Sequence, residues 1–283
     1  LSDPANGVGG IFETSFWVSY PYLLPCIFSS AMSSIAFILA FYKLPESLPE
    51  ESRSSSEASP LVQLQATVSS ISSVLKLPTI SSLVVVNFLF LLGFTMMHGT
   101  FILFTSMEPE SGGLGWSERD NGWVFAFIGL LGVIIQGGLI GPLTRRYNLR
   151  GLMIVGTALA GLGVASIPYA PAEFSWLIFG SCAGLAIGNG LYSPTQSSLL
   201  TFETKGGGFE LGMVMGAQEG SGALARIIGP LLAASIWSVT VEGTGLWTFH
   251  TCFRVAGVFF FAALLLQLRL RSSDGPGPDI GGN

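Results

Sequence analysis

The sequence has few charged residues: Asp, Glu, Lys and Arg together make up 10% of its 283 residues. A typical soluble domain has about 25% of these residues, so the composition excludes an ordinary water-soluble protein. Hydrophobic residues make up 49% of the chain, and the mean hydropathy is +0.62. We therefore expect an all-α polytopic protein that lies in a lipid bilayer.

Cysteine and histidine are also scarce, with three and two residues respectively. Cys26, Cys182 and Cys252 lie far apart within apolar runs, and neither His98 nor His250 completes a metal-ligand spacing with them. We expect the cysteines to be small packing residues, without a disulfide framework. We further expect no metal site, no cofactor and no nucleic acid partner. No nucleophile–base arrangement indicates an enzyme.

Long apolar runs are abundant instead, and we count seven. Each is about twice the ten or so residues of a membrane barrel strand, and none alternates in polarity, so membrane-spanning helices are predicted. The predicted helices cover residues 16–42, 80–106, 121–142, 152–169, 174–200, 213–240 and 246–268.

The distribution of Lys and Arg predicts the orientation. With the N-terminus outside, one cation, Arg119, lies on the external side. Nine cations then lie on the cytoplasmic side: Lys43, Arg53, Lys76, Arg145, Arg146, Arg150, Lys205, Arg269 and Arg271. This is the positive-inside pattern, so we expect an external N-terminus and a cytoplasmic C-terminus.

The long connection at 43–78 begins with many Pro, Glu and Ser residues, which is typical of a solvated linker. Its second half carries an apolar stripe at helical spacing, formed by Leu61, Leu64, Val68, Ile71 and Leu75. Two interpretations are open. The stripe could lie flat on the cytoplasmic membrane surface, or it could pack on the helical bundle.

Two runs carry glycine at every fourth residue. The positions are Gly180, Gly184 and Gly188 in one run, and Gly212, Gly216 and Gly220 in the next. Such ridges allow close helix packing, either for static stability or for sliding. Pro194 is expected to kink its helix, because it lacks a backbone donor. The neighbouring Asn189 and Gln196 suggest that this helix lines a cavity.

Glu219 and Arg226 place opposite charges within one apolar run. At 100° per residue they share an 80° sector with small residues, namely Gly212, Gly216, Ala223 and Pro230. A lipid-facing Arg would cost about 2.5 to 3.5 kcal/mol, whereas a Leu gains only about 0.3 to 0.6 kcal/mol. We therefore expect this face to point inward and to meet other helices.

The two charges are seven residues apart, or about 10.5 Å along the helix axis, so we expect each to have other partners. The candidates are Gln218, Asn189, Gln196, Gln136, Asn87 and His98. Glu219 could carry a proton, and Arg226 could attract an anion or hold the carboxylate. Neutralisation for assembly alone is the alternative. His98 is a second candidate proton carrier, and a packing histidine is its alternative.

Several motifs, taken in order, resemble the major facilitator superfamily, and in particular its drug:proton antiporter and zinc-induced-facilitator-like branch. "LSDPA" resembles the external segment after the fifth helix of that family, and "YPYLLPC" and "LPES" resemble the sixth helix. "GNGLYSPTQSSLL" resembles helix ten, and "GAQEGSGALARIIGP" resembles helix eleven. "GPLTRRYNLRG" resembles a cytoplasmic gate loop, although Arg145 replaces its acidic residue. We carry over Gly141, Arg146 and Arg150; a solvated basic loop is the alternative.

The resemblance implies that the chain is a fragment holding helices six to twelve. Residues 1–42 would be an external segment and the last helix of the N-terminal half, and 43–78 the central cytoplasmic linker. Residues 79–271 would form the C-terminal six-helix half, and 272–283 a disordered tail. The missing N-terminal helices would be its partner.

The function implied is secondary transport by alternating access, in which proton re-entry drives efflux of a small organic solute across the plasma or vacuolar membrane. We expect no transport by the fragment alone. A seven-helix receptor is the alternative, because it would share the predicted topology. The absence of Asp-Arg-Tyr and Asn-Pro-x-x-Tyr motifs at the corresponding helix ends disfavours it.

Overall fold

The computed structural model describes residues 16, 19–20, 22–44, 76–207, 211–243 and 247–270. All regular structure in these residues is helical. The predicted linker stripe at 61–75 and the predicted tail at 272–283 lie outside the described residues. The chain divides into two compact units, Leu1–Pro60 and Leu61–Asn283.

Among its described residues, the first unit contains one long helix, α3, which spans Leu23–Lys43 and corresponds to the predicted run 16–42. None of its residues is buried within the described chain, and bulky side chains such as Phe28, Phe37 and Phe41 are exposed. A helix that is apolar on every side requires lipid or other helices around it.

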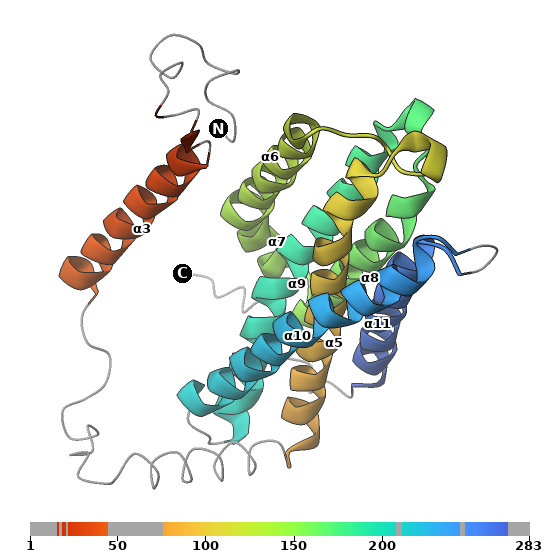
Figure 1. Ribbon diagram of the computed structural model, residues 1–283. Coiled ribbons are helices and arrows are strands. Elements are labelled where there is room, and N and C mark those ends of the chain that lie inside the picture. The colour runs from red at the N-terminus through yellow and green to blue at the C-terminus, as the bar shows by residue number, and fades with distance from the viewer. Residues whose placement is uncertain are drawn as a thin grey trace, which may run out of the picture. The chain divides into compact units, whose positions relative to one another are not determined.

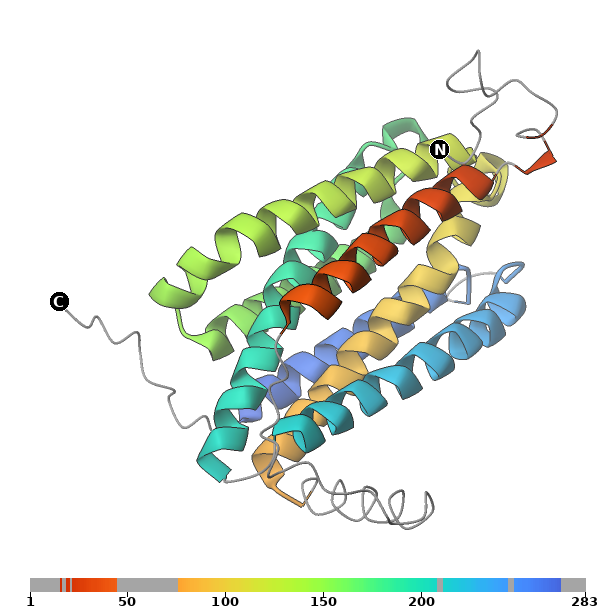
Figure 2. The same cartoon turned by 90° about the vertical axis from the view of Figure 1, so that its left-hand side faces the viewer.

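The second unit contains the remaining long helices, which are labelled in Figure 1. They are α5 (Pro78–Ser106), α6 (Glu118–Ile134), α7 (Ile140–Arg146), α8 (Leu149–Ser166), α9 (Leu177–Gly207), α10 (Leu211–Thr240) and α11 (His250–Arg269). Short helical turns lie at η3 (Pro109–Ser111), η4 (Ile135–Leu139), η5 (Ile167–Tyr169) and η6 (Ala172–Phe174). α10 packs on α5, α5 on α11, α11 on α8, α8 on α9 and α9 on α6. Figure 2 shows these helices side by side.

A helix lies at each of the seven predicted positions, and six have the length and hydropathy needed to cross a membrane. The six are Leu23–Lys43, Pro78–Ser106, Glu118–Arg146, Leu149–Tyr169, Leu211–Thr240 and His250–Arg269. α9 is not among them, although it is 31 residues long. It contains several polar residues, including Asn189, Thr195 and Gln196, which lower its hydropathy.

The third span is less regular than predicted. The side chain of Ser117 caps α6 in a reciprocal capping box with Asp120, so the helix begins before the predicted residue 121. It widens into a π turn at Ile135–Leu139 and continues as α7. Pro142 has no N–H to bond the carbonyl four residues earlier, and the wider turn accommodates that loss. Gly137 and Gly138 lie within this turn.

α8 and α9 approach each other through glycine. A Cβ atom on Gly188 would overlap the main chain of Gly156 and Ala160, and one on Gly163 would lie 2.6 Å from the carbonyl oxygen of Ser181. Gly184 also faces α8, 3.3 Å from the carbonyl oxygen of Leu159 as measured from an added Cβ. The predicted close packing is therefore present at two of the three glycines. A Cβ on the third, Gly180, would meet nothing within 4 Å.

The interface between α10 and α5 uses other small residues than those predicted. An added Cβ on Gly229 would overlap the hydroxyl of Thr95, and one on Gly222 would lie 2.8 Å from Cδ1 of Leu91. Thr95 also donates a hydrogen bond to the carbonyl oxygen of Ala225 at 3.1 Å. Close contact brings the two backbones near enough for this bond.

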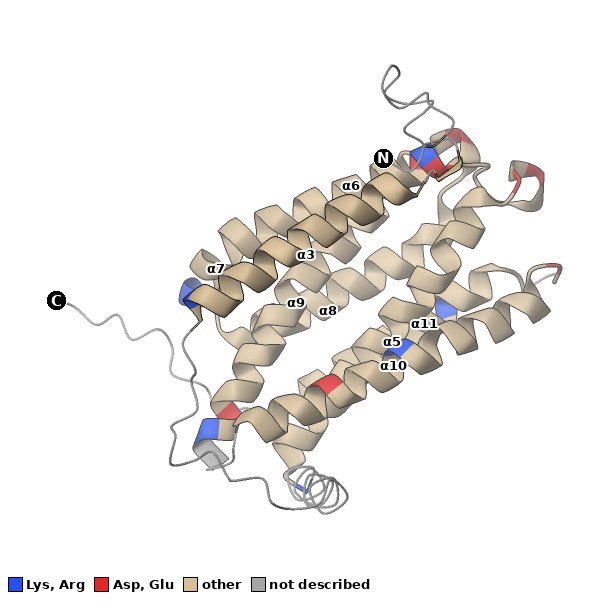
Figure 3. Cartoon of the chain, turned by 60° about the vertical axis from the view of Figure 1, so that its left-hand side comes forward, with Lys and Arg blue, Asp and Glu red and all other residues tan. Residues whose placement is uncertain are grey.

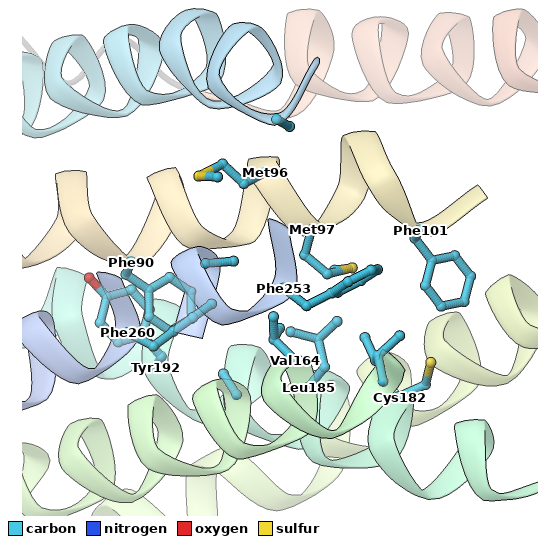
Figure 4. Close-up of a cluster of buried hydrophobic side chains, with 14 of the residues drawn as sticks. Phe90, Met96, Met97, Phe101, Val164, Cys182, Leu185, Tyr192, Phe253 and Phe260 are labelled. Carbon is cyan, nitrogen blue, oxygen red and sulfur yellow. The ribbon is translucent and has the colours of Figure 1, made fainter. Parts of the chain in front are cut away.

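Aromatic rings fill the core between α5, α9 and α11. The ring of Phe90 stacks on Tyr192 at a centroid distance of 3.6 Å and meets the edge of Phe260 at 5.0 Å. Phe253 is also fully buried, and Figure 4 shows these side chains together. α9 continues as one helix through Pro194.

Candidate functional site

A pair of opposite charges lies on the exposed side of α10. Nη2 of Arg226 is 3.7 Å from Oε2 of Glu219, and their side chains are 55% and 71% exposed. The expectation that these residues are too far apart for contact is wrong. Ala223 lies between them and is exposed, so the two long side chains meet over a methyl group.

The small-residue face that carries the two charges is not packed within the described chain. Its six members are all exposed: Gly212, Gly216, Glu219, Ala223, Arg226 and Pro230. A Cβ on Gly212, Gly216 or Gly220 would meet nothing within 4 Å. No described helix of the second unit covers this face, because a second stripe of small residues packs on α5 instead, and the expectation that the face meets other helices stays a prediction. That stripe contains Gly222, Ala225, Gly229 and Ala233.

Charged residues lie mainly near the helix ends in Figure 3, and the exceptions are on α10 and α11. An exposed Arg within a membrane-spanning helix is costly against hydrocarbon. The exposed face of α10 around Glu219 and Arg226 therefore requires water or other protein groups beside it, rather than lipid.

Gln218 and Gln196 were candidate partners of the charge pair, but both residues are buried. Nε2 of Gln196 donates to the carbonyl oxygen of Leu83 at 2.8 Å. The main-chain oxygen of Gln218 accepts a hydrogen bond from Nδ2 of Asn87 at 3.2 Å. The first hydrogen bond joins α9 to α5, and the second joins α5 to α10. Each glutamine also has a buried Oε1 atom without a hydrogen-bond partner in the described chain.

His98 and Asn189 lie together at another place, where they line a pocket of about 120 Å³ between α5, α6 and α9. The ring of His98 meets Phe94 at 5.5 Å and Phe125 at 5.9 Å. Phe101 packs against Phe125 at 5.8 Å. The six predicted pathway residues thus divide into an exposed charge pair, two buried glutamines and a pocket.

The phenylalanines of this pocket were not among the predicted site residues. A usable signal is present, because Phe94, His98 and Phe101 recur on α5 at helical spacing. The same spacing is also typical of an ordinary core stripe. Only the structure shows that these three residues border a cavity.

The segment predicted as a gate loop is mostly helical. Gly141 and Arg146 belong to α7, and Arg150 lies in the first turn of α8, which Asn148 caps by accepting a hydrogen bond from the N–H of Gly151 at 2.6 Å. Nη2 of Arg150 donates to the carbonyl oxygens of Gln267 and Leu268 at 3.1 and 3.0 Å. Arg150 therefore caps the C-terminal end of α11.

This contact predicts unequal roles for the two arginines. Arg150→Ala is expected to lower the free energy of unfolding by about 1 to 2 kcal/mol, because two charge-assisted hydrogen bonds are lost. Arg146→Ala is the control, since Arg146 is exposed over the ring of Tyr147 at 5.9 Å, and we expect a change of about 0.5 kcal/mol or less. Unfolding in mixed micelles with increasing SDS measures both. Equal losses would contradict the assigned capping role.

Comparison with known proteins identifies related sequences. The Major Facilitator Superfamily profile matches residues 5–230. Major facilitator superfamily domain-containing protein 10 of Mus musculus is 28% identical over 265 residues, which cover 85% of this chain and 52% of the mouse protein. Multidrug resistance protein MdtH of Proteus mirabilis (strain HI4320) is 31% identical over 157 residues, which cover 53% of this chain and 35% of that protein.

A solved structure shares the fold. The crystal structure of the peptide transporter POT in complex with sulfate superimposes with a TM-score of 0.56 at 20% identity. The match covers 69% of this chain and 38% of that one. The predicted fold class, a partial helical membrane bundle of this type, is thereby confirmed. The chain spans about half the length of the mouse relative and less of the other two.

Proposed function

This chain belongs to the major facilitator superfamily, and from that premise we propose that it forms part of a proton-coupled antiporter that exports a small organic solute. The family consists of transporters rather than enzymes. The name of MdtH, a multidrug resistance protein, supports the drug-efflux part of the proposal. Assignment to the drug:proton antiporter and zinc-induced-facilitator-like branch is part of the same proposal.

The observation that carries the proposal is the exposed charge pair of α10. Glu219 is a carboxylate within a membrane-spanning helix, and no side chain of the described residues covers it apart from its contact with Arg226. A carboxylate open to water can exchange a proton, and Arg226 lies within ion-pair distance of it. Intramembrane charges that face water are typical of proton and substrate paths.

We propose that preceding helices outside this sequence cover the face of α10 that carries Glu219 and Arg226. The two halves would then rock around a site between them, with residues 79–271 as the C-terminal half and 43–78 as the linker. Coverage of only about half of the mouse relative supports this part of the proposal.

The described cations support the proposed orientation. The end of the second unit where α5 begins and α11 ends carries six of them: Lys76, Arg145, Arg146, Arg150, Lys205 and Arg269. Arg119 lies at the opposite end. The positive-inside rule then places the first end in the cytoplasm. The plasma or vacuolar membrane is the proposed location.

Reconstitution tests this function. The complete protein, with its preceding helices, is expected to alkalinise acid-loaded proteoliposomes when a transported solute is added outside, as a trapped pH-sensitive dye would record. The 283-residue chain alone is the control and should give no flux. Solute movement without proton movement would contradict antiport. Ligand-dependent nucleotide exchange on a G protein would favour the receptor, which family membership disfavours.

A further inference from the structure

Three helices direct side chains into the pocket that contains His98 and Asn189. α9 contributes Cys182, Leu185, Ala186 and Asn189, which follow the i, i+3, i+4, i+7 pattern of one helical face. α5 contributes a stripe with the same spacing, and α6 adds two residues one turn apart. Figure 4 shows Met97 and Phe101 of α5 pointing toward Leu185 and Cys182 of α9.

The lining of the pocket is rich in aromatic side chains and contains no Asp, Glu, Lys or Arg. Phe94, Phe101 and Phe125 surround it, and Met97 and Cys182 add sulfur atoms. Aromatic rings attract one another edge to face, and sulfur atoms make favourable contacts with ring edges. The lining therefore favours an aromatic ring over an aliphatic group of equal size.

Two polar side chains of the lining have hydrogen-bonding capacity to spare. Asn189 makes no side-chain hydrogen bond within the described part of the chain. His98 contacts Phe94 and Phe125 by its ring, and it too makes no hydrogen bond to a described residue. Polar groups that line a cavity without a partner suit a ligand that carries a complementary hydroxyl or amide.

We propose that this pocket binds one uncharged aromatic ring that bears a hydrogen-bonding group, as the recognition element of the exported solute. That the bound solute is exported rests on the proposed function, whereas the binding of the ring does not. A volume of about 120 Å³ is close to that of engineered cavities of about 150 Å³ that hold benzene. The rest of a larger molecule would extend past His98, which is exposed.

Charge is the second determinant of specificity. No Asp, Glu, Lys or Arg lines the pocket, so a cationic or anionic ring would lose its hydration without a partner. The pocket should therefore prefer benzyl alcohol to benzylammonium or benzoate. It should also prefer benzyl alcohol to cyclohexylmethanol, which carries the same hydroxymethyl group on a six-membered ring of similar size but lacks the π-system.

Fluorine NMR of 4-fluorobenzyl alcohol with the complete protein in lipid nanodiscs tests the proposal. We expect saturable broadening that unlabelled benzyl alcohol reverses, and competition about tenfold weaker for cyclohexylmethanol. Benzylammonium and benzoate should compete more weakly still. Equal competition by the aliphatic alcohol would overturn the proposal and indicate an unspecific apolar cavity.

Variants locate the binding. Ala186→Phe fills the pocket from α9 and should weaken probe binding about tenfold or more. Ala234→Phe is the matched control, because Ala234 is exposed on α10 and lines no part of the pocket, and it should bind as the unmodified protein does. Should Ala186→Phe fail to fold, Ile128→Phe fills the pocket from α6. Unweakened binding in a folded filling variant would overturn the assignment.

The two proposals fail separately. Probe binding that Ala186→Phe removes, in a protein without solute-driven proton flux, would support the pocket and contradict antiport. Proton-coupled flux of a solute in a protein that does not bind the probe would support antiport and overturn this inference.

Asn189→Leu should reduce the preference for benzyl alcohol over toluene without weakening toluene binding, because it removes a polar partner and keeps the side-chain volume similar.

Discussion

Gly188→Leu is expected to prevent α8 and α9 from packing and to cost about 3 kcal/mol or more of folding free energy. A Cβ atom at this position would overlap the main chain of Gly156 and Ala160. Backbone cannot move aside as a flexible side chain can, so the helices must separate and lose contacts along the interface. Heating followed by fluorescence-detected size exclusion measures the loss as a lower midpoint of aggregation.

Gly180→Leu supplies the matched control, because it makes the same change in the same helix two turns earlier. An added Cβ there meets nothing within 4 Å, so the midpoint should stay close to that of the unmodified protein or rise with the gain in helix propensity. Equal destabilisation at the two positions would show that the leucine side chain itself, rather than the contact with α8, governs the effect.

Glu219→Gln in the complete protein is expected to abolish proton-coupled solute flux while the protein still folds. The glutamine side chain keeps the size of the glutamate but cannot exchange a proton. Because Glu219 contacts no described side chain apart from Arg226, at 3.7 Å, the fold of residues 79–271 should not depend on its charge. The measurement is solute-driven alkalinisation of proteoliposomes, with size exclusion as the test of folding.

Glu110→Gln is the control for this prediction. Glu110 is exposed in the short turn η3 after α5, outside the proposed path, and its neutralisation should leave flux unchanged. Unchanged proton-coupled flux in Glu219→Gln would reduce the charge pair to a structural feature. A variant that moves solute without protons would instead support Glu219 as the coupling residue, because binding and coupling would then be separated.

The positions of the helices could be predicted from the sequence, but not every end. Apolar side chains are costly in water, and unpaired backbone groups are costly in hydrocarbon, so each long apolar run is expected to form a membrane helix, and helices lie where all seven were predicted. The start of α6 and the C-terminal end of α9 were less predictable. Ser117 begins α6 by a local cap, and α9 continues seven residues beyond the predicted residue 200 to Gly207.

The grouping of the candidate site residues could be predicted only in part. Spacing alone placed Glu219 and Arg226 on one face, and they do share it. It could not place His98 beside Asn189, because these residues are 91 positions apart and meet only when α5 and α9 line one pocket. Nor could it assign Arg150 to the end of α11, since that contact depends on how α8 and α11 pack.

α10 shows most clearly where the sequence was insufficient. It carries small residues on two faces, one with Gly212 and Gly216 and another with Gly222 and Gly229, and either could have formed a close interface. By itself the sequence determined that the chain is a bundle of membrane helices with two charges on one face of α10. The tertiary structure decided that the other face packs, because α5 presents Leu91 and Thr95 where Gly222 and Gly229 leave room for them. The charged face is left exposed as a result.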